Sequence, residues 1–294
     1  MKNIFIVIFS FLLIVMSSSC SEENIGTSVI DTSSPHRTEF DTWILENYVK
    51  EYNIDFRYYL DDIESDMMYN LIPADLDKSK KLAKIIKYLW LESYDEVFDP
   101  TGNNKDFMRK YSPKMIQLVG CRAVNPNSGT SVLGTAEGGI KVVLYDLNSM
   151  DPTNIGALNK SYFHTMHHEF VHILHQIKPI PVEYKTITPS DYSPTGWQNR
   201  GTTQAQKLRF ITPYASSEPQ EDFAEMISSF LTMSDISWQK ALEDAASDGS
   251  DGAIKINKKF EIAKNWLKTS WNIDIDLLKS IISRRSENIS NILN

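Results

Sequence analysis

Cysteine, basic charge and long apolar runs are all scarce in this chain of 294 residues. Only Cys20 and Cys121 are present, so disulfides contribute little and a hydrophobic core must hold the fold. The 30 Lys and Arg against 38 Asp and Glu give a formal charge of -8, which argues against a nucleic-acid partner. After the first 19 residues no apolar run is long enough to cross a bilayer, and no internal repeat is visible.

The N-terminus has the order of an export signal. Lys2 precedes an apolar run over residues 4–16, too short for a stable membrane span, and three serines then lead to Cys20. This order resembles a bacterial lipoprotein precursor, which implies cleavage before Cys20 and a lipid on its thiol. A secretory signal with an incidental cysteine is the alternative. The following Ser21-Glu22-Glu23 resembles the export tag of Bacteroidetes surface lipoproteins and implies a location on the outer face of the outer membrane.

Removal of residues 1–19 leaves 294 minus 19, or 275 residues, enough for one large domain or two lobes that share a cleft. If Cys20 carries lipid, Cys121 has no partner for an internal disulfide. Residues 20–39 are polar and predict a tether. We therefore expect a folded domain over 40–294, with an α/β lobe over roughly 40–178 and a helical lobe over roughly 179–294.

The hydrophobic patterns predict an α+β fold. NIDFRYYL alternates like a strand, and residues 75–98 have the pattern of an amphipathic helix. KMIQLVGCRAV and GIKVVLYDL are rich in β-forming residues, and the intervening NPNSGTSVLGTAEGG predicts turns. From residue 160 onward the pattern is mostly helical.

Five of the six histidines lie in one stretch, HTMHHEFVHILHQ, over residues 164–176. It contains His168-Glu169-x-x-His172 within a pattern that predicts a helix. Residues four apart lie about one turn apart on the same helix face, so both imidazoles reach one ion. Zinc suits two imidazoles plus a carboxylate and leaves a position for water, which Glu169 is placed to deprotonate. The motif therefore predicts a zinc site with a third ligand elsewhere.

The other histidines of this stretch are not expected to bind the metal. His175 lies seven residues after His168, about 10 Å further along the helix axis and out of reach of the ion. A metzincin would need Gly at position 175 and His at position 178, and the chain has neither. Pro179 then ends the helix. We expect His164 and His167 to lie at the surface or behind the ligands, and His175 to pack or hydrogen-bond below the site.

A second helix is predicted in YASSEPQEDFAEMISSF, residues 214–230. Ser217 and Gln220 have the spacing of a capping box, and an apolar stripe follows. Glu221 and Glu225 share one face, so Glu221 can bind the metal while Glu225 hydrogen-bonds a histidine or the ligand carboxylate from behind. Two glutamates on a helix are more often solvated. The histidine motif favours the metal site here.

HHEFVHILHQ together with YASSEPQEDFAE resembles the zinc metallohydrolase lipoproteins that Bacteroidetes place beside TonB-dependent import systems of the outer membrane. The site is also similar to that of lethal-factor-like gluzincin peptidases. This resemblance implies a zincin-like fold: a small mixed sheet with the active-site helix, followed by a mostly helical C-terminal lobe. It also implies one zinc per chain on His168, His172 and Glu221, support from Glu225, and a hydrogen bond from Tyr214 to the transition state.

The implied chemistry is zinc-dependent hydrolysis of an amide in a peptide or glycopeptide destined for import. Glu169 would move a proton from water to the leaving amine, and Tyr214 would hydrogen-bond the oxyanion. The strand in GIKVVLYDL would line the cleft and pair with an extended peptide through its free edge. Trp197, in the loop between the two site helices, is expected to face the substrate, whereas Trp90 and Trp266 are expected in the core.

A non-catalytic binding lipoprotein that partners an outer-membrane transporter is the alternative. Glu169 favours the hydrolase, because a structural zinc site usually closes its fourth position with protein and has no use for a general base. Amidases that act on non-protein amides would use the same metal chemistry. The residues therefore leave the substrate open.

Overall fold

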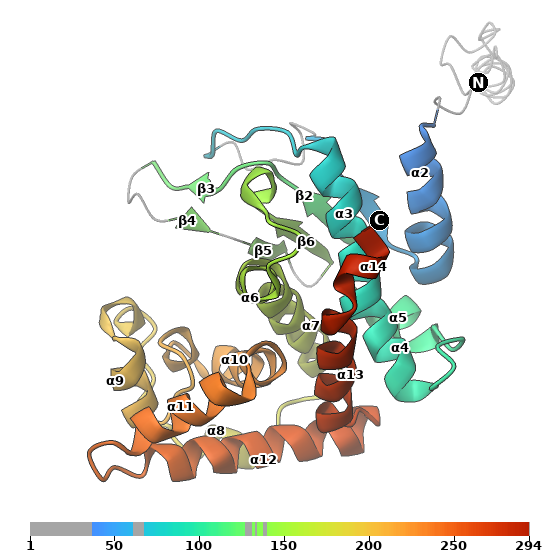
Figure 1. Ribbon diagram of the computed structural model, residues 1–294. Helices are drawn as coiled ribbons and strands as arrows, with labels where there is room; N and C mark the ends of the chain where they lie inside the picture. Colours follow the sequence, from blue (N-terminus) through green and yellow to red (C-terminus); the bar gives the residue numbers. More distant parts are fainter. Residues whose placement is uncertain (1–36, 61–67, 127–130, 133, 138–139, 294) are drawn as a thin grey trace, which may run out of the picture. The chain divides into compact units, whose positions relative to one another are not determined.

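A small mixed sheet and a large set of helices make up the fold (Figure 1). The computed structural model describes residues 37–60, 68–126, 131–132, 134–137 and 140–293. Residues from Glu39 onward form one unit. The predicted signal peptide and Cys20 lie outside the described residues.

The main sheet has the strand order β1-β2-β6-β5. Its strands are β1 (Asp55–Arg57), β2 (Met115–Leu118), β6 (Lys141–Leu144) and β5 (Gly134–Glu137). The first three run parallel, and β5 is antiparallel to β6. All four residues of β6 are buried, as expected for a strand inside a sheet that is covered on both faces. The expected α+β fold with a small mixed sheet is confirmed.

The segment before β6 differs from its prediction as a region of turns. It contains β4 (Ser131–Val132), which pairs with β3 (Ala123–Val124), as well as β5. The prediction that the strand in GIKVVLYDL has a free edge was wrong, because β5 pairs with β6. The outer strand on this side of the described sheet is β5. The β5 sequence, GTAE, contains Gly, Ala and Glu, which are uncommon in strands. Its residues therefore gave little indication of a strand.

The predicted amphipathic helix over residues 75–98 is present as three consecutive segments. These are α3 (Leu76–Ile86), a π-helical turn η3 (Lys87–Leu91) and α4 (Glu92–Phe98). Asp75 caps α3, since its side chain accepts a hydrogen bond from the backbone N–H of Lys78. Before them lie α2 (Glu39–Ile44) and η1 (Leu45–Lys50), and after them α5 (Asp106–Tyr111).

The histidine motif lies on a long helical run, as predicted. After η4 (Leu147–Ser149), this run consists of α6 (Ile155–Leu158), the π-helical η5 (Asn159–Phe163) and α7 (His164–Ile177). Lys178 then adopts an extended backbone because Pro179 follows it, and the helix ends there.

The second predicted helix is α10 (Pro219–Thr232), but its start differs from the expected capping box. Pro219 occupies the first helical position and forces an extended backbone on Glu218, which becomes the N-cap residue. Ser217 therefore lies one residue too early to cap the helix. Its hydroxyl is buried and has no hydrogen-bond partner among the described residues.

The remaining helices follow in the C-terminal half, as the hydrophobic pattern predicted. They are α8 (Val182–Lys185), η6 (Trp197–Asn199), α9 (Thr202–Lys207), η7 (Tyr214–Ser216), α11 (Asp235–Ala246), α12 (Gly252–Trp271), α13 (Ile275–Glu287) and α14 (Ile289–Leu293). None of the described helices is long and apolar enough to cross a membrane.

Aromatic packing anchors both site helices in one hydrophobic core. Phe170, on α7, contacts Trp90 with ring centroids 5.7 Å apart. Phe223, on α10, contacts Trp266 at 5.0 Å. Both tryptophans are buried, which confirms their expected place in the core. The two helices that carry the histidines and glutamates are thus held by separate parts of the same core.

Candidate metal centre

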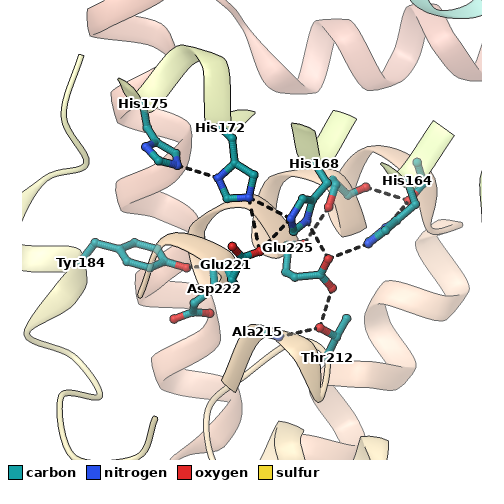
Figure 2. Close-up of polar contacts among 12 residues, drawn as sticks. His164, His168, His172, His175, Tyr184, Thr212, Ala215, Glu221, Asp222 and Glu225 are labelled. Atoms are coloured by element: carbon teal, nitrogen blue, oxygen red, sulfur yellow. Dashed lines mark hydrogen bonds and ion pairs between the residues drawn. The ribbon is translucent and has the colours of Figure 1, made fainter. Parts of the chain in front are cut away.

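Helix α7 presents a row of histidines to the glutamates of α10 (Figure 2). His164, His168 and His172 are spaced by four residues, so their rings follow one helix face. Glu221 and Glu225 occupy the facing side of α10 with the same spacing. The histidine row of α7 and the glutamate pair of α10 therefore face each other where the two helices pack together.

Three potential ligand atoms converge at the centre of this contact. Nε2 of His168 lies 2.9 Å from Oε2 of Glu221 and 3.0 Å from Nε2 of His172. Nε2 of His172 lies 3.3 Å from the same carboxylate oxygen. The three residues that the sequence marks as metal ligands thus meet in a group whose ligand atoms all lie within 4.8 Å of one another.

Glu225 lies behind this group. Its Oε1 is 2.8 Å from Nδ1 of His168 and 2.8 Å from Nε2 of His164. Its Oε2 accepts a hydrogen bond of 2.6 Å from the hydroxyl of Thr212. His164, His168 and Glu225 form a second group of metal-type ligands. We interpret this second group as hydrogen-bonded support for His168 and not as a metal site. Each of the short contacts to Glu225 can be a hydrogen bond, because an imidazole N–H or a hydroxyl is available as the donor.

The donor set fits zinc. A zinc-binding imidazole must be neutral and offer the lone pair of one nitrogen, so the other nitrogen carries the hydrogen. Glu225 provides the acceptor for that hydrogen on Nδ1 of His168, which turns the Nε2 lone pair toward His172 and Glu221. Two imidazoles and one carboxylate are a common protein ligand set of catalytic zinc.

The surrounding carboxylates favour a positive charge at this point. Burial disfavours an imidazolium at His168, but hydrogen bonds with Glu221 and Glu225 outweigh burial and raise its pKa to about 10. Burial likewise opposes ionisation of Glu221, yet hydrogen bonds with His168 and His172 hold its pKa well below the usual value. A proton on His168 supplies the positive charge that the two carboxylates stabilise, and a bound divalent cation would supply it in place of that proton.

Glu169 follows His168 on α7 and is half-buried. Burial raises the pKa of its carboxyl, while the neighbouring His168 and His172 act in the opposite direction. A carboxylate with a raised pKa accepts a proton more readily near neutral pH and can release it again. The direction of this shift favours uptake of a proton by Glu169.

Tyr214 lies at the exposed side of the same group. Its ring stacks on His168 with centroids 5.8 Å apart and an interplanar angle of 29°. The side chain is 38% exposed, and burial of the rest together with the charge of Glu221 raises the pKa of the phenol. Tyr214 thus stays protonated at neutral pH and keeps a hydrogen to donate. Tyr214 also contacts Trp197 edge-on, with ring centroids 4.9 Å apart, so Trp197 borders the site.

The remaining histidines of the stretch have other partners. His167 is buried, and its Nδ1 lies 3.0 Å from the Tyr94 hydroxyl. Burial and the nearby His164 lower its pKa to about 3, so its ring is neutral. Nε2 of His175 lies 2.7 Å from Nδ1 of His172, and burial together with the nearby His172 lowers the pKa of His175 to about 4.

The sequence pattern missed Thr212 and a buried ion pair under α10. Lys259 donates to Asp222 over 2.7 Å, and both side chains are fully buried. Asp222 also accepts a hydrogen bond from the hydroxyl of Tyr192. Asp222 follows Glu221 in the chain, so this ion pair ties the first turn of α10 to Lys259 on α12. A lysine on an amphipathic helix carries no local sign that it will be buried.

Comparisons with known proteins agree with a zinc site. A family described as "Putative zinc-binding metallo-peptidase" matches residues 33–276. A crystal structure described as a "putative zinc-binding metallo-peptidase", from Bacteroides caccae ATCC 43185, is 47% identical in sequence, with a TM-score of 0.75. That match covers 90% of this chain and 97% of the other. None of the curated proteins matches the chain. Because the family match extends over most of the chain, the protein belongs to this family of zinc-binding metallopeptidases.

Proposed function

We propose that this metallopeptidase is a gluzincin-like enzyme with one zinc per chain, held by His168, His172 and Glu221. The observation that carries the proposal is the convergence of two imidazole Nε2 atoms and one carboxylate oxygen beside Glu169. The zinc-binding family supports the choice of metal. The half-buried general base beside the site favours catalysis over a purely structural metal.

The proposed reaction is hydrolysis of a peptide bond. When bound, zinc would polarise the scissile carbonyl and lower the pKa of the attacking water. Glu169 takes one proton from that water as it attacks the carbonyl carbon. When the C–N bond breaks, Glu169 passes the proton to the leaving amine nitrogen. The raised pKa of Glu169 suits both steps, because the carboxyl must gain and then lose a proton near neutral pH.

Tyr214 stabilises the transition state in this proposal. Its ring stacks on His168 and Glu221 is close enough to raise its pKa, which supports this role and keeps the hydrogen available. The phenol donates that hydrogen to the negative oxygen that develops on the carbonyl. Glu225 holds the ring of His168 from behind through the Nδ1 contact.

An extended peptide would bind along β5. This strand is the outer one on its side of the described sheet, and it contacts α7. An outer strand offers backbone hydrogen-bonding groups to another extended chain. Pairing along β5 replaces the expected pairing along β6. The substrates proposed are peptides or glycopeptides.

Metal content tests the ligand set. The purified protein is expected to hold about one zinc per chain by elemental analysis, and Glu221→Ala is expected to lose most of it because an anionic ligand is gone. Glu218→Ala is the matched control, since Glu218 is exposed and only three residues away. Wild-type protein that neither contains nor takes up zinc on titration would refute the proposed centre.

Anchoring at the outer membrane is a separate part of the proposal, supported by the N-terminal sequence up to Cys20. A lipid on Cys20 would hold the protein at the cell surface beside a TonB-dependent transporter that imports the products. In a Bacteroides host, Cys20→Ala is expected to move the protein from the membrane fraction to the soluble fraction, because the acylated thiol is the only anchor proposed. Equal membrane content of the variant and the wild type would exclude this anchor.

A further inference from the structure

A pair of histidines one turn apart on α7 lies at the edge of the proposed zinc centre (Figure 2). Nδ1 of His172 lies 2.7 Å from Nε2 of His175, which is within hydrogen-bonding distance. The two rings meet edge-on, with centroids 5.0 Å apart and planes at 79°. Their spacing of three residues makes them neighbours on the helix surface. His175 makes none of the contacts described for His168 or Glu221.

The role of this contact follows from the tautomer that a metal ligand requires. Nε2 of His172 faces His168 and Glu221, so this is the nitrogen whose lone pair is needed for zinc. A neutral imidazole then carries its hydrogen on Nδ1, and that hydrogen needs an acceptor. Among the described residues, the one hydrogen-bond partner found for Nδ1 of His172 is Nε2 of His175.

The two proposed zinc histidines thus have different supports. His168 has the carboxylate of Glu225 behind its Nδ1, and that carboxylate is itself fixed by Thr212 and His164. His172 has an imidazole nitrogen in the corresponding place. A hydrogen bond of this kind fixes both the tautomer and the rotation of a ligand ring.

We propose that His175 is a positioning residue for zinc: it accepts the Nδ1 hydrogen of His172 and holds that ring with Nε2 toward the metal. The inference rests on the proposed ligand set of His168, His172 and Glu221. Without the acceptor, the ring of His172 loses its fixed tautomer and orientation. Zinc is then held less tightly, although all three ligands remain.

Two substitutions separate the hydrogen bond from simple packing. His175→Phe keeps a planar ring of similar size but removes the acceptor. His175→Gln removes the ring but places an amide oxygen at a reach similar to that of Nε2. Gln176→Ala, an exposed neighbour on the same helix, is the matched control. If the phenylalanine variant fails to fold, His175→Ala takes its place in the comparison with His175→Gln.

Zinc affinity and release are measured by competition with a chelating dye, without any substrate. We expect His175→Phe to bind zinc about 10- to 100-fold more weakly than the wild type, the usual effect of losing a support behind a metal ligand. His175→Gln should recover most of that loss. The visible spectrum of the cobalt-loaded protein should shift in the phenylalanine variant and return toward the wild type with glutamine, which a role in packing alone does not predict.

The outcomes distinguish this inference from the proposed zinc centre. If the wild type binds one zinc and His172→Ala does not, the ligand set stands. An unchanged affinity and cobalt spectrum in His175→Phe would then overturn the role of His175 alone. An equal loss in the phenylalanine and glutamine variants would also overturn it, because the acceptor would not be what matters. A wild type that binds no zinc would overturn both proposals.

Discussion

Replacement of Glu169 by glutamine is expected to slow peptide hydrolysis by about 10²- to 10⁴-fold, the usual contribution of a general acid–base group. Glutamine keeps the size of the side chain, but its amide does not accept a proton from water. The three proposed zinc ligands are untouched, so the zinc content should stay near one per chain. This combination of lost turnover and retained metal distinguishes an enzyme from a binding protein with a structural metal.

The measurement compares initial rates on a mixed peptide library with zinc content determined on the same samples. Glu183→Gln makes the same chemical change at an exposed position on α8 and should leave both quantities unchanged. Tyr214→Phe should lower the rate by about 10²- to 10³-fold, as expected for loss of one oxyanion donor. If Glu169→Gln keeps the wild-type rate, the proposed path of the proton is wrong.

Replacement of Lys259 by methionine is expected to lower the free energy of unfolding by about 3–5 kcal/mol. Lys259 and Asp222 are both fully buried, so removal of the lysine leaves a carboxylate with no counter-charge in the core. The lysine also donates to the backbone carbonyl of Arg209 and lies 4.2 Å from the ring centroid of Phe210. Hence a single substitution removes an ion pair, a hydrogen bond and a cation–π contact.

Chemical denaturation of the metal-free protein measures this effect without a contribution from zinc. Lys258→Met is the matched control, because Lys258 is exposed on the same helix, and its change should stay within about 0.5 kcal/mol. A second substitution, Asp222→Leu, made together with Lys259→Met, should recover much of the loss by removing the unpaired charge. A loss below about 1 kcal/mol for Lys259→Met alone would show that the pair contributes little net stability.

Several features of the site are local and follow from helical periodicity. The spacing of His168 and His172 places both imidazoles on one face of any helix, and the spacing of Glu221 and Glu225 does the same for the carboxylates. Pro179 predicts where α7 ends, because proline restricts the residue before it. These features need no knowledge of the rest of the fold, and the structure has each of them.

Other features depend on packing between segments far apart in the chain. The contact between His168 and Glu221 joins residues 53 positions apart, and the role of Thr212 behind Glu225 has no sequence signal. The pairing of β5 with β6 and the burial of Lys259 likewise arise from neighbours supplied by other elements. The periodicity of a helix determines which of its residues share a face. Which other element packs against that face depends on the arrangement of all helices and strands in the core, because these contacts join residues far apart in the chain.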